Sequence, residues 1–491
     1  MTRLVVASNR VPVPRGTRPP QGGLETGILS ALEAQGGLWF GWSGKISDDK
    51  RVARTRSGNV DFATTDLARR DYDDYYRGYS NRVMWPLLHA RLERMDYHRS
   101  YDNGYRRINQ FLAEGLVPLL RPDDTIWIHD YHLIPLGMAL RRAGCRQRIG
   151  FFLHTPFPPY DVFRALPHYR ARLLEFGAYD LVGFQTDVDL RGFVTSVHYG
   201  VPGGKASKRS VVIGTRPTWT GVFPISIDVD DVAAQAAKGR SSPSGRRLIS
   251  SLAARQLILG VDRLDYSKGL VARFHAYERL LQRYAAIRRK VIYLQVAQPS
   301  RGDVPEYQQM RRALDTAAGE INGRFAEYDW MPLRYLHRGF ARNTLLGFLA
   351  VSRVGLVTPF RDGMNLIAKE FVAAQSPEDP GVLVLSELAG AARELQAALI
   401  VNPYDIDDVA DGLARALDMP LEERRQRFDA MMKVLRKNDI HRWRRKFLEA
   451  LNRPPGRTSE PARLVDRQTR QRRGAEAPRR PDVSRGPSAK T

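Results

Sequence analysis

The sequence contains a single cysteine, Cys145, and no apolar run long enough to cross a bilayer. One thiol cannot form an internal disulfide, and it cannot by itself build a cysteine-based zinc site. A spanning helix needs about 20 consecutive apolar residues, and the apolar run within residues 1–8 is also too short for a signal peptide. These absences predict a reducing, cytoplasmic compartment and no membrane partner.

Internal repeats of the length found in solenoids are also absent, which excludes a repeat architecture. Hydrophobic residues make up 43% and charged residues 26% of the 491 residues, an ordinary globular composition that excludes wholesale disorder. Because single cores stop growing near about 250–300 residues, we expect two large domains.

Acidic residues are too few to balance the basic ones, and the formal net charge is +24. A nucleic-acid-binding or scaffold protein is one interpretation, since Arg and Lys neutralise phosphates. Residues 452–491 carry eleven basic and four acidic residues, but the remaining charge is spread along the chain. Composition drift and anionic small substrates explain this better, so no specific nucleic acid is predicted. The Pro- and Arg-rich tail, 452–491, is predicted to be disordered.

Apolar, β-rich runs alternate with helix-period segments, which is typical of parallel sheets covered by helices. This pattern predicts an α/β protein with two Rossmann-like, doubly wound domains facing a central cleft. The polar, aperiodic stretch 237–247 is the expected boundary. It separates residues 1–236 from residues 248–451, whose final helices are free to cross back to the first domain. The candidate strands are 3–8, 125–129, 148–154, 181–185, 257–261, 291–296, 354–358 and 382–386.

Polar residues follow several of these strands, where ligands bind in open α/β sheets. Arg263 and Lys268 follow one strand, and fixed cations there would stabilise a departing diphosphate; surface salt bridges are the alternative. The turn at Gly363 leads into a helix, where backbone amides can bind hydroxyls or phosphate, and Glu370 can hold ribose hydroxyls or pair with a surface cation. The glycines at 22–23 also precede a helix, a weak signal shared with ordinary turns.

Two further strand ends carry candidate residues. His154 ends one strand before a rigid turn, although a lone histidine is more often structural. Asp130 ends another, and it could accept bonds from sugar hydroxyls or cap the next helix. Asp228 and Asp230 superficially match the nucleophile loop of aspartate-dependent phosphatases, but the expected glycine is absent and helix capping is the better interpretation.

Together these segments resemble the trehalose-6-phosphate synthase family of GT-B-type retaining glycosyltransferases. The resemblance runs from residue 3 to about residue 451. So many long motifs in the family's order exclude a chance match. Residues 159–161 depart from the commonest family wording, which leaves the shape of one lip of the cleft open. The motifs that carry the resemblance are 8–10, 37–44, 127–132, 154–158, 262–269, 299–303 and 361–370.

The resemblance implies residue roles. Arg10, Tyr76 and Arg301 would hold the acceptor phosphate, Asp130 the acceptor hydroxyls, and Trp85 and Thr155 would govern anomer selectivity. Arg263, Lys268, Asp362 and His154 would be catalytic, with the first two clamping the diphosphate and the last two contacting the donor glucose. The implied donor-binding set is Gly22, Gly23, Arg263, Lys268, Phe340, Asp362, Gly363, Met364, Asn365, Leu366, Ile367, Ala368, Lys369 and Glu370.

The reaction implied is transfer of glucose from a nucleotide-glucose to glucose 6-phosphate, giving α,α-trehalose 6-phosphate. UDP-glucose is the expected donor, and GDP- and ADP-glucose stay open. No cofactor and no metal is expected, and a homo-oligomer is left open. A related transferase with another acceptor, such as one that makes glucosylglycerol phosphate or uses a cyclitol, is the nearest alternative; Tyr76, Trp85, Asp130 and Arg301 argue against it.

Overall fold

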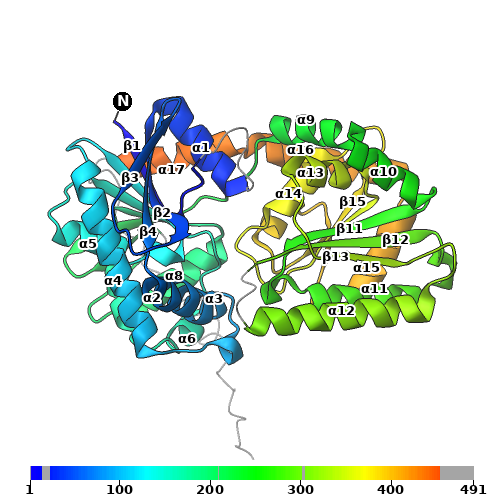
Figure 1. Cartoon of the computed structure of the whole chain (residues 1–491), viewed down its shortest axis with the longest axis horizontal. Helices are drawn as coiled ribbons and strands as arrows, with labels where there is room; N and C mark the ends of the chain where they lie inside the picture. Colours follow the sequence, from blue (N-terminus) through cyan, green and yellow to red (C-terminus); the bar gives the residue numbers. More distant parts are fainter. Residues whose placement is uncertain (1, 14–22, 208, 301–304, 454–491) are drawn as a thin grey trace, which may run out of the picture. The chain divides into compact units, whose positions relative to one another are not determined.

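A computed structural model describes residues 2–13, 23–207, 209–300 and 305–453 (Figure 1). The fold is built on two sheets. The ten-stranded first sheet has the order β3-β4-β2-β1-β5-β6-β7-β10-β9-β8. Its strands are β1 (Leu4–Arg10), β2 (Gly37–Ile46), β3 (Ala53–Ser57), β4 (Val60–Leu67), β5 (Thr125–His129), β6 (Arg148–Phe152), β7 (Leu181–Phe184), β8 (Lys205–Ala206), β9 (Ser210–Ile213) and β10 (Arg216–Val222).

The second sheet has six strands in the order β13-β12-β11-β14-β15-β16, and every neighbouring pair is parallel. In the first sheet, the neighbours along the row β4-β2-β1-β5-β6-β7-β10 pair in parallel. The outer strands β3, β9 and β8 pair antiparallel. The expected fold class is therefore confirmed. The strands of the second sheet are β11 (Gln256–Arg263), β12 (Val291–Gln298), β13 (Leu333–Leu336), β14 (Val354–Val357), β15 (Val382–Ser386) and β16 (Leu399–Val401).

Helices cover both faces of each sheet (Figure 1). On the first sheet, α1 and α17 share a core with Leu4 and Val6, while α4, α5 and α8 share one with Val5 and Ala7. The helices before the second sheet are α1 (Gly23–Gln35), α2 (Arg69–Asp71), the π-helix η1 (Tyr72–Met84), α3 (Trp85–Leu88), α4 (Arg99–Leu116), α5 (Leu136–Arg142), α6 (Tyr160–Phe163), α7 (Tyr169–Glu175), α8 (Asp187–Gly200), α9 (Val229–Ser241) and α10 (Pro243–Leu252).

On the second sheet, α9, α10, α13 and α14 pack together on one face, and α11, α12 and α15 on the other (Figure 1). Because strands 257–261 and 382–386 are buried along their whole length, they read as continuous apolar runs. The remaining helices are α11 (Leu270–Arg283), α12 (Pro305–Phe325), α13 (Arg342–Val351), α14 (Leu366–Ala374), α15 (Ile406–Asp418), α16 (Leu421–Lys437) and α17 (Ile440–Asn452).

The C-terminal helix α17 packs on β6 and β7 of the first sheet. A Cβ atom at Gly150 or Gly183 would lie within 3.0 Å of the Phe447 ring, so these glycines make room for the helix. The same ring stacks on Trp127 of β5, with centroids 4.6 Å apart. We retain 1–236 and 248–451 as proposed domains, with α17 crossing back.

The stretch 237–247 is not the aperiodic linker expected from its composition. It is helical on both sides of Ser242, which ends α9 and caps α10 by accepting a bond from Gly245 N at 3.1 Å. Pro243 occupies the first turn of α10, where its missing N–H costs nothing. The glycine at 239 serves packing, because α13 crosses α9 at Gly347. Serine, proline and glycine therefore mark a cap and a helix crossing here.

Gly347→Ala should destabilise the fold by about 1–3 kcal/mol, because overpacking forces backbone shifts. A Cβ atom there would lie 2.6 Å from Gly239 O and 2.7 Å from Arg240 N. Gly323→Ala in α12 is the matched control: nothing lies within 4 Å of its Cβ position, so it should stabilise by roughly 0.4–1 kcal/mol. Urea unfolding of both variants measures the difference, and equal stabilities would contradict the close crossing.

Candidate active site

Both sheets have a topological switch point, where the chain order reverses and ligands bind beyond the strand ends. In the first sheet it lies between β1 and β5, and in the second between β11 and β14. Arg10 ends β1 and Asp130 follows β5, while Arg263 ends β11 and the 358–370 segment follows β14. The fold thus places residues predicted from local motifs at the two positions where a doubly wound sheet binds its ligand.

Asp130 sits in a strained and partly buried position. Its φ is 74°, a region that costs a non-glycine residue free energy and is found at functional sites. Its carboxylate accepts a bond from His154 N at 3.3 Å. Burial raises the pKa of Asp130 to about 6, although backbone N–H groups of Tyr131, His154 and Thr155 and the charge of Arg263 oppose the shift. Arg263 therefore lies close enough to Asp130 to act on its charge.

An aromatic wall borders this site. Tyr76 lies on the π-helix η1, a rare element often found at functional sites, and its ring centroid is 5.4 Å from that of Trp42. Trp85 begins α3 and is only 6% exposed. Its indole N–H donates to Asp265 Oδ1 at 3.3 Å, and the guanidinium of Arg263 lies 5.6 Å from its ring centroid. Trp85 therefore joins the first-sheet side of the site to the loop after β11.

Lys268 and Asp362 form an ion pair at the second switch point. Lys268 Nζ lies 2.5 Å from Asp362 Oδ2, and Asn365 Nδ2 donates to the same oxygen at 3.0 Å. Burial alone would raise the pKa of Asp362, but the ammonium of Lys268 outweighs it and holds that pKa below its ordinary value. The ion pair lies in an enclosed setting, with Lys268 8% exposed.

Arg273 holds the Lys268 loop in place. Its guanidinium is 1% exposed, lies 2.5 Å from Asp262, and donates to Thr358 Oγ1 and Lys268 O at 3.0 Å each. A buried cation that is fully paired acts by fixing geometry rather than by meeting a ligand. It ties the loop after β11 to the end of β14.

The loop after β14 meets the loop after β6. A Cβ atom at Gly363 would collide with the carbonyl oxygen of His154 and lie 3.0 Å from Thr155 C, so only glycine fits. Arg361 also donates to Phe157 O at 3.3 Å. His154, Thr155, Asp362 and Gly363 are therefore neighbours, although about 200 residues separate the two loops.

The start of α14 offers main-chain groups to a ligand. Asn365, with φ 77°, caps the helix by accepting a bond from Ala368 N at 3.1 Å. Lys369 is fully buried and donates to Ile225 O at 2.7 Å and Glu394 Oε2 at 2.6 Å, so its side chain is engaged within the protein. Met364 and Ala368 are buried, while Leu366 and Ile367 are partly buried against the second-sheet core.

Two further predicted donor-binding residues lie on separate elements, Glu370 in α14 and Phe340 just before α13. Glu370 in α14 is buried, and burial raises its pKa although Arg342 Nη2 lies 3.5 Å away. Arg342 also contacts Asp231 at 2.7 Å. Phe340 packs on Phe348 with ring centroids 5.5 Å apart, and it precedes α13.

Three of the predicted site residues have no described surroundings. Gly22 and Arg301 lie outside the described residues, and Gly23 is described only as the first residue of α1. The sequence interpretation missed Asp265, which is buried and accepts bonds from Trp85, from Ser267 N at 3.0 Å and from Tyr307 at 3.4 Å. Its position between Arg263 and Lys268 was the available signal. Asp228 caps α9 by accepting from Asp231 N, as expected.

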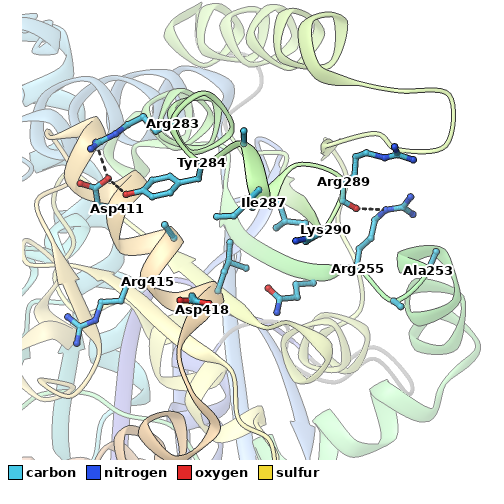
Figure 2. Close-up of a pocket in the computed structure, with 17 residues that line it drawn as sticks. Ala253, Arg255, Arg283, Tyr284, Ile287, Arg289, Lys290, Asp411, Arg415 and Asp418 are labelled. Atoms are coloured by element: carbon cyan, nitrogen blue, oxygen red, sulfur yellow. Dashed lines mark hydrogen bonds and ion pairs between the residues drawn. The ribbon is translucent and has the colours of Figure 1, made fainter.

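A hollow of about 1170 Å³ lies elsewhere (Figure 2). Its lining includes Gln256 and Val291, the first residues of β11 and β12, and so it lies at the opposite strand ends from the site. In its lining, Asp411 is already paired with Arg283 at 2.9 Å and with the Tyr284 hydroxyl at 2.8 Å. Size alone therefore does not mark the active site.

The described residues contain no helix long and apolar enough to span a membrane. Within the same ranges, no cluster of three or more His, Cys, Asp or Glu side chains is arranged to hold a metal ion.

Comparison with known proteins gives consistent results. The sequence model of glycosyltransferase family 20 matches residues 9–453. The chain is 49% identical to a trehalose-6-phosphate synthase of Klebsiella pneumoniae over 94% of this chain and 97% of that one. It is 48% identical to one of Sinorhizobium fredii over 92% and 98%.

Solved structures agree. A UDP-forming α,α-trehalose-phosphate synthase of Burkholderia xenovorans, solved with glucose 6-phosphate, is 48% identical, with a TM-score of 0.88 and coverage of 91% of this chain and 99% of that one. An E. coli protein bound with UDP-2-fluoro glucose is also 48% identical, with a TM-score of 0.88 and coverage of 92% and 99%.

Proposed function

Because this chain belongs to glycosyltransferase family 20, we propose that it transfers glucose from UDP-glucose to glucose 6-phosphate, giving α,α-trehalose 6-phosphate and UDP. The single observation that carries this is the convergence of Asp130, Arg263 and Trp85. It brings the carboxylate proposed to bind the acceptor sugar close to a cation proposed to bind the donor diphosphate. Relatives of nearly full coverage are named for this reaction.

In the proposed chemistry the donor diphosphate leaves toward Arg263 and Lys268. Preorganised cations there would stabilise the negative charge that develops on the leaving oxygens. Asp362 holds Lys268 in place through an ion pair at 2.5 Å, and donor-sugar contacts fall to His154 and Asp362. In this scheme no protein carboxylate acts as nucleophile. The acceptor hydroxyl attacks from the same face that the diphosphate leaves, which retains the α configuration. The leaving diphosphate accepts the proton of that hydroxyl.

On the acceptor side, Asp130 is proposed to accept bonds from glucose hydroxyls, and Arg10 and Arg301 to bind the phosphate. Arg offers forked donors that match phosphate oxygens. The guanidinium of Arg10 lies close beside Gly44, where a Cβ atom would come within 2.7 Å of Arg10 Nε. Tyr76 completes the phosphate site, while Trp85 and Thr155 restrict the face from which the acceptor approaches.

The donor nucleotide would bind along the turn and first residues of α14. Main-chain N–H groups from Gly363 to Ala368 are proposed for the diphosphate, a helix start being favourable for anions. Glu370 is proposed for the ribose hydroxyls, and the Phe340 main chain for the base. The proposed reaction needs no metal ion, because Arg263 and Lys268 supply the positive charge that a metal cation would otherwise bring. The proposed compartment is the cytoplasm.

The test combines purified protein with UDP-, GDP- or ADP-glucose and glucose 6-phosphate, with and without EDTA, and identifies the product by NMR. We expect α,α-trehalose 6-phosphate, fastest from UDP-glucose and at an unchanged rate with EDTA. Product made only with another phosphorylated or cyclitol acceptor would replace the proposed acceptor. Loss of rate in EDTA that Mg²⁺ restores would overturn the metal-free scheme alone.

Acceptor binding should weaken at acid pH because Asp130 must be ionised to accept hydroxyl bonds. Its pKa is about 6, so KM for glucose 6-phosphate should rise as pH falls from 7.5 through about 6. The phosphate of glucose 6-phosphate also has a pKa of about 6. The Asp130→Asn variant separates the effect of the carboxyl from that of the phosphate. That variant should show a KM about tenfold higher at pH 7.5 and retain only the phosphate-dependent rise. Identical pH profiles for both proteins would contradict the role.

A further inference from the structure

Two histidines, the buried His129 and the partly buried His154, contact each other at the site. His129 is the last residue of β5 and is 1% exposed, and its Nδ1 lies 3.0 Å from Nε2 of His154. The ring planes are inclined by 23° and the centroids are 5.2 Å apart. Because the centroid separation exceeds the N···N distance by about one ring width, the rings meet edge to edge through these two nitrogens.

Both rings are neutral at physiological pH. Burial, together with His154, holds the pKa of His129 well below its ordinary value, and burial lowers the pKa of His154 to about 3. A neutral imidazole carries one proton, so one nitrogen donates and the other accepts. Either His129 Nδ1 donates to His154 Nε2, or the reverse. The two arrangements present opposite hydrogen-bonding character at the remaining nitrogen of His154.

The surroundings of His129 favour the first arrangement. Its Nε2 has no hydrogen-bond partner among the described residues. Trp127 and Trp443 pack beside it at centroid distances of 4.5 and 6.4 Å, and within the same ranges their indole N–H groups also lack partners. Indole nitrogen can only donate. A proton on Nε2 would therefore add a third unpaired donor, and buried unpaired N–H groups are rare and costly.

We propose that His129 is a positioning residue that fixes the tautomer of His154. Its Nδ1–H donates to Nε2 of His154, which leaves the proton of His154 on Nδ1. His154 then meets the donor sugar as a hydrogen-bond donor to a hydroxyl oxygen. The identity of that sugar rests on the proposed function, whereas the tautomer is a property of the protein alone. Partners that orient a functional histidine in this way hold the ring and its proton before the ligand arrives.

NMR of the free protein tests the tautomer without any substrate. We expect long-range ¹H–¹⁵N spectra of ¹⁵N-histidine-labelled protein to show His154 Nδ1 protonated and Nε2 unprotonated, with peaks assigned from His154→Gln and His129→Phe. The opposite pattern, or an average of two tautomers, would overturn the proposal. This outcome is independent of whether glucose is transferred, so it cannot be confused with failure of the proposed function.

Three substitutions of His129 separate its hydrogen bond from its packing. Asparagine places an amide nitrogen near the position of Nδ1, glutamine places it near Nε2, and phenylalanine keeps the ring but has no donor. We expect His129→Phe and His129→Gln to lower kcat/KM for the nucleotide sugar by about tenfold, with KM for the acceptor unchanged. His129→Asn should recover most of this loss.

His198→Asn, at an exposed position on α8, is the control for histidine replacement. It should leave both kinetic constants and the His154 spectrum as in the parent protein. Equal losses in all three His129 variants, accompanied by equal drops in thermal midpoint and an unchanged His154 tautomer, would show a purely structural role. That result would overturn the assignment.

Discussion

Replacing Arg263 by alanine is expected to lower kcat for glucosyl transfer by about 10²–10³, with KM for glucose 6-phosphate nearly unchanged. Arg263 ends β11 at the switch point of the second sheet, where the proposed transfer would develop negative charge on the departing diphosphate. A group that acts mainly in the transition state lowers kcat rather than binding. Steady-state kinetics with both substrates varied measure the two effects separately.

The fold should survive this change. Arg263 is exposed, and its guanidinium lies 5.6 Å from the ring centroid of Trp85, an interaction worth about 0.5–1 kcal/mol at exposed sites. Arg311→Ala on α12, where the arginine is exposed and pairs with Asp315, is the matched control and should leave kcat unchanged. A raised KM for the acceptor with normal kcat would move Arg263 from the leaving-group site to the acceptor site.

Lys268→Ala should lower kcat in the same way but also destabilise the protein. The substitution leaves Asp362 buried without its ammonium partner, and the unopposed burial then raises the pKa of that carboxyl. The double variant Lys268→Ala/Asp362→Asn removes the stranded charge. We expect it to recover thermal stability, which would show that the stranded carboxylate causes the destabilisation, but not turnover, because Asp362 is itself a proposed donor contact. Recovery of both would assign Lys268 a structural role only.

The sequence predicts the parallel strands well. All eight candidate strands coincide with β1, β5, β6, β7, β11, β12, β14 and β15 to within a few residues. Such strands are buried on both faces and therefore read as continuous apolar runs. The other strands were not predicted, including the parallel strands β2, β4 and β10 inside the first sheet. The edge strand β3 consists of Ala-Arg-Thr-Arg-Ser and is exposed throughout, so it is recognised by its pairing with β4 and not by its composition.

The sequence also locates the loops of the site but not their contacts. Local motifs identify Arg263, Lys268 and Asp362 separately, because each follows an apolar run. That Lys268 pairs with Asp362, 94 positions later, and that Trp85 donates to Asp265, 180 positions later, follows from the order of strands in the two sheets. The same limit applies to Lys369, where the motif suggests a ligand contact and the structure shows a buried side chain bonded to Ile225 and Glu394.

The two sides of the site are fixed to each other by backbone contact as well as by charge. Gly363 follows the catalytic candidate Asp362, and its Cα faces the carbonyl of His154, so the donor loop and the loop after β6 touch without any side chain between them. Gly390 packs in turn against the carbonyl of Gly363. A main chain held on both sides cannot yield to a new methyl group without moving the loop.

Gly363→Ala is therefore expected to lower kcat/KM for the nucleotide sugar by 10²-fold or more, since a displacement of about 1 Å at a reacting site can cost about 10²-fold. Glycine's conformational freedom is not the reason, because the added Cβ meets backbone atoms. Gly319→Ala on α12, where nothing lies within 4 Å of the Cβ position, serves as control and should keep full activity. Kinetics together with thermal unfolding decide the outcome: a folded Gly363→Ala protein with parental kcat/KM would show that the two loops need not touch for transfer.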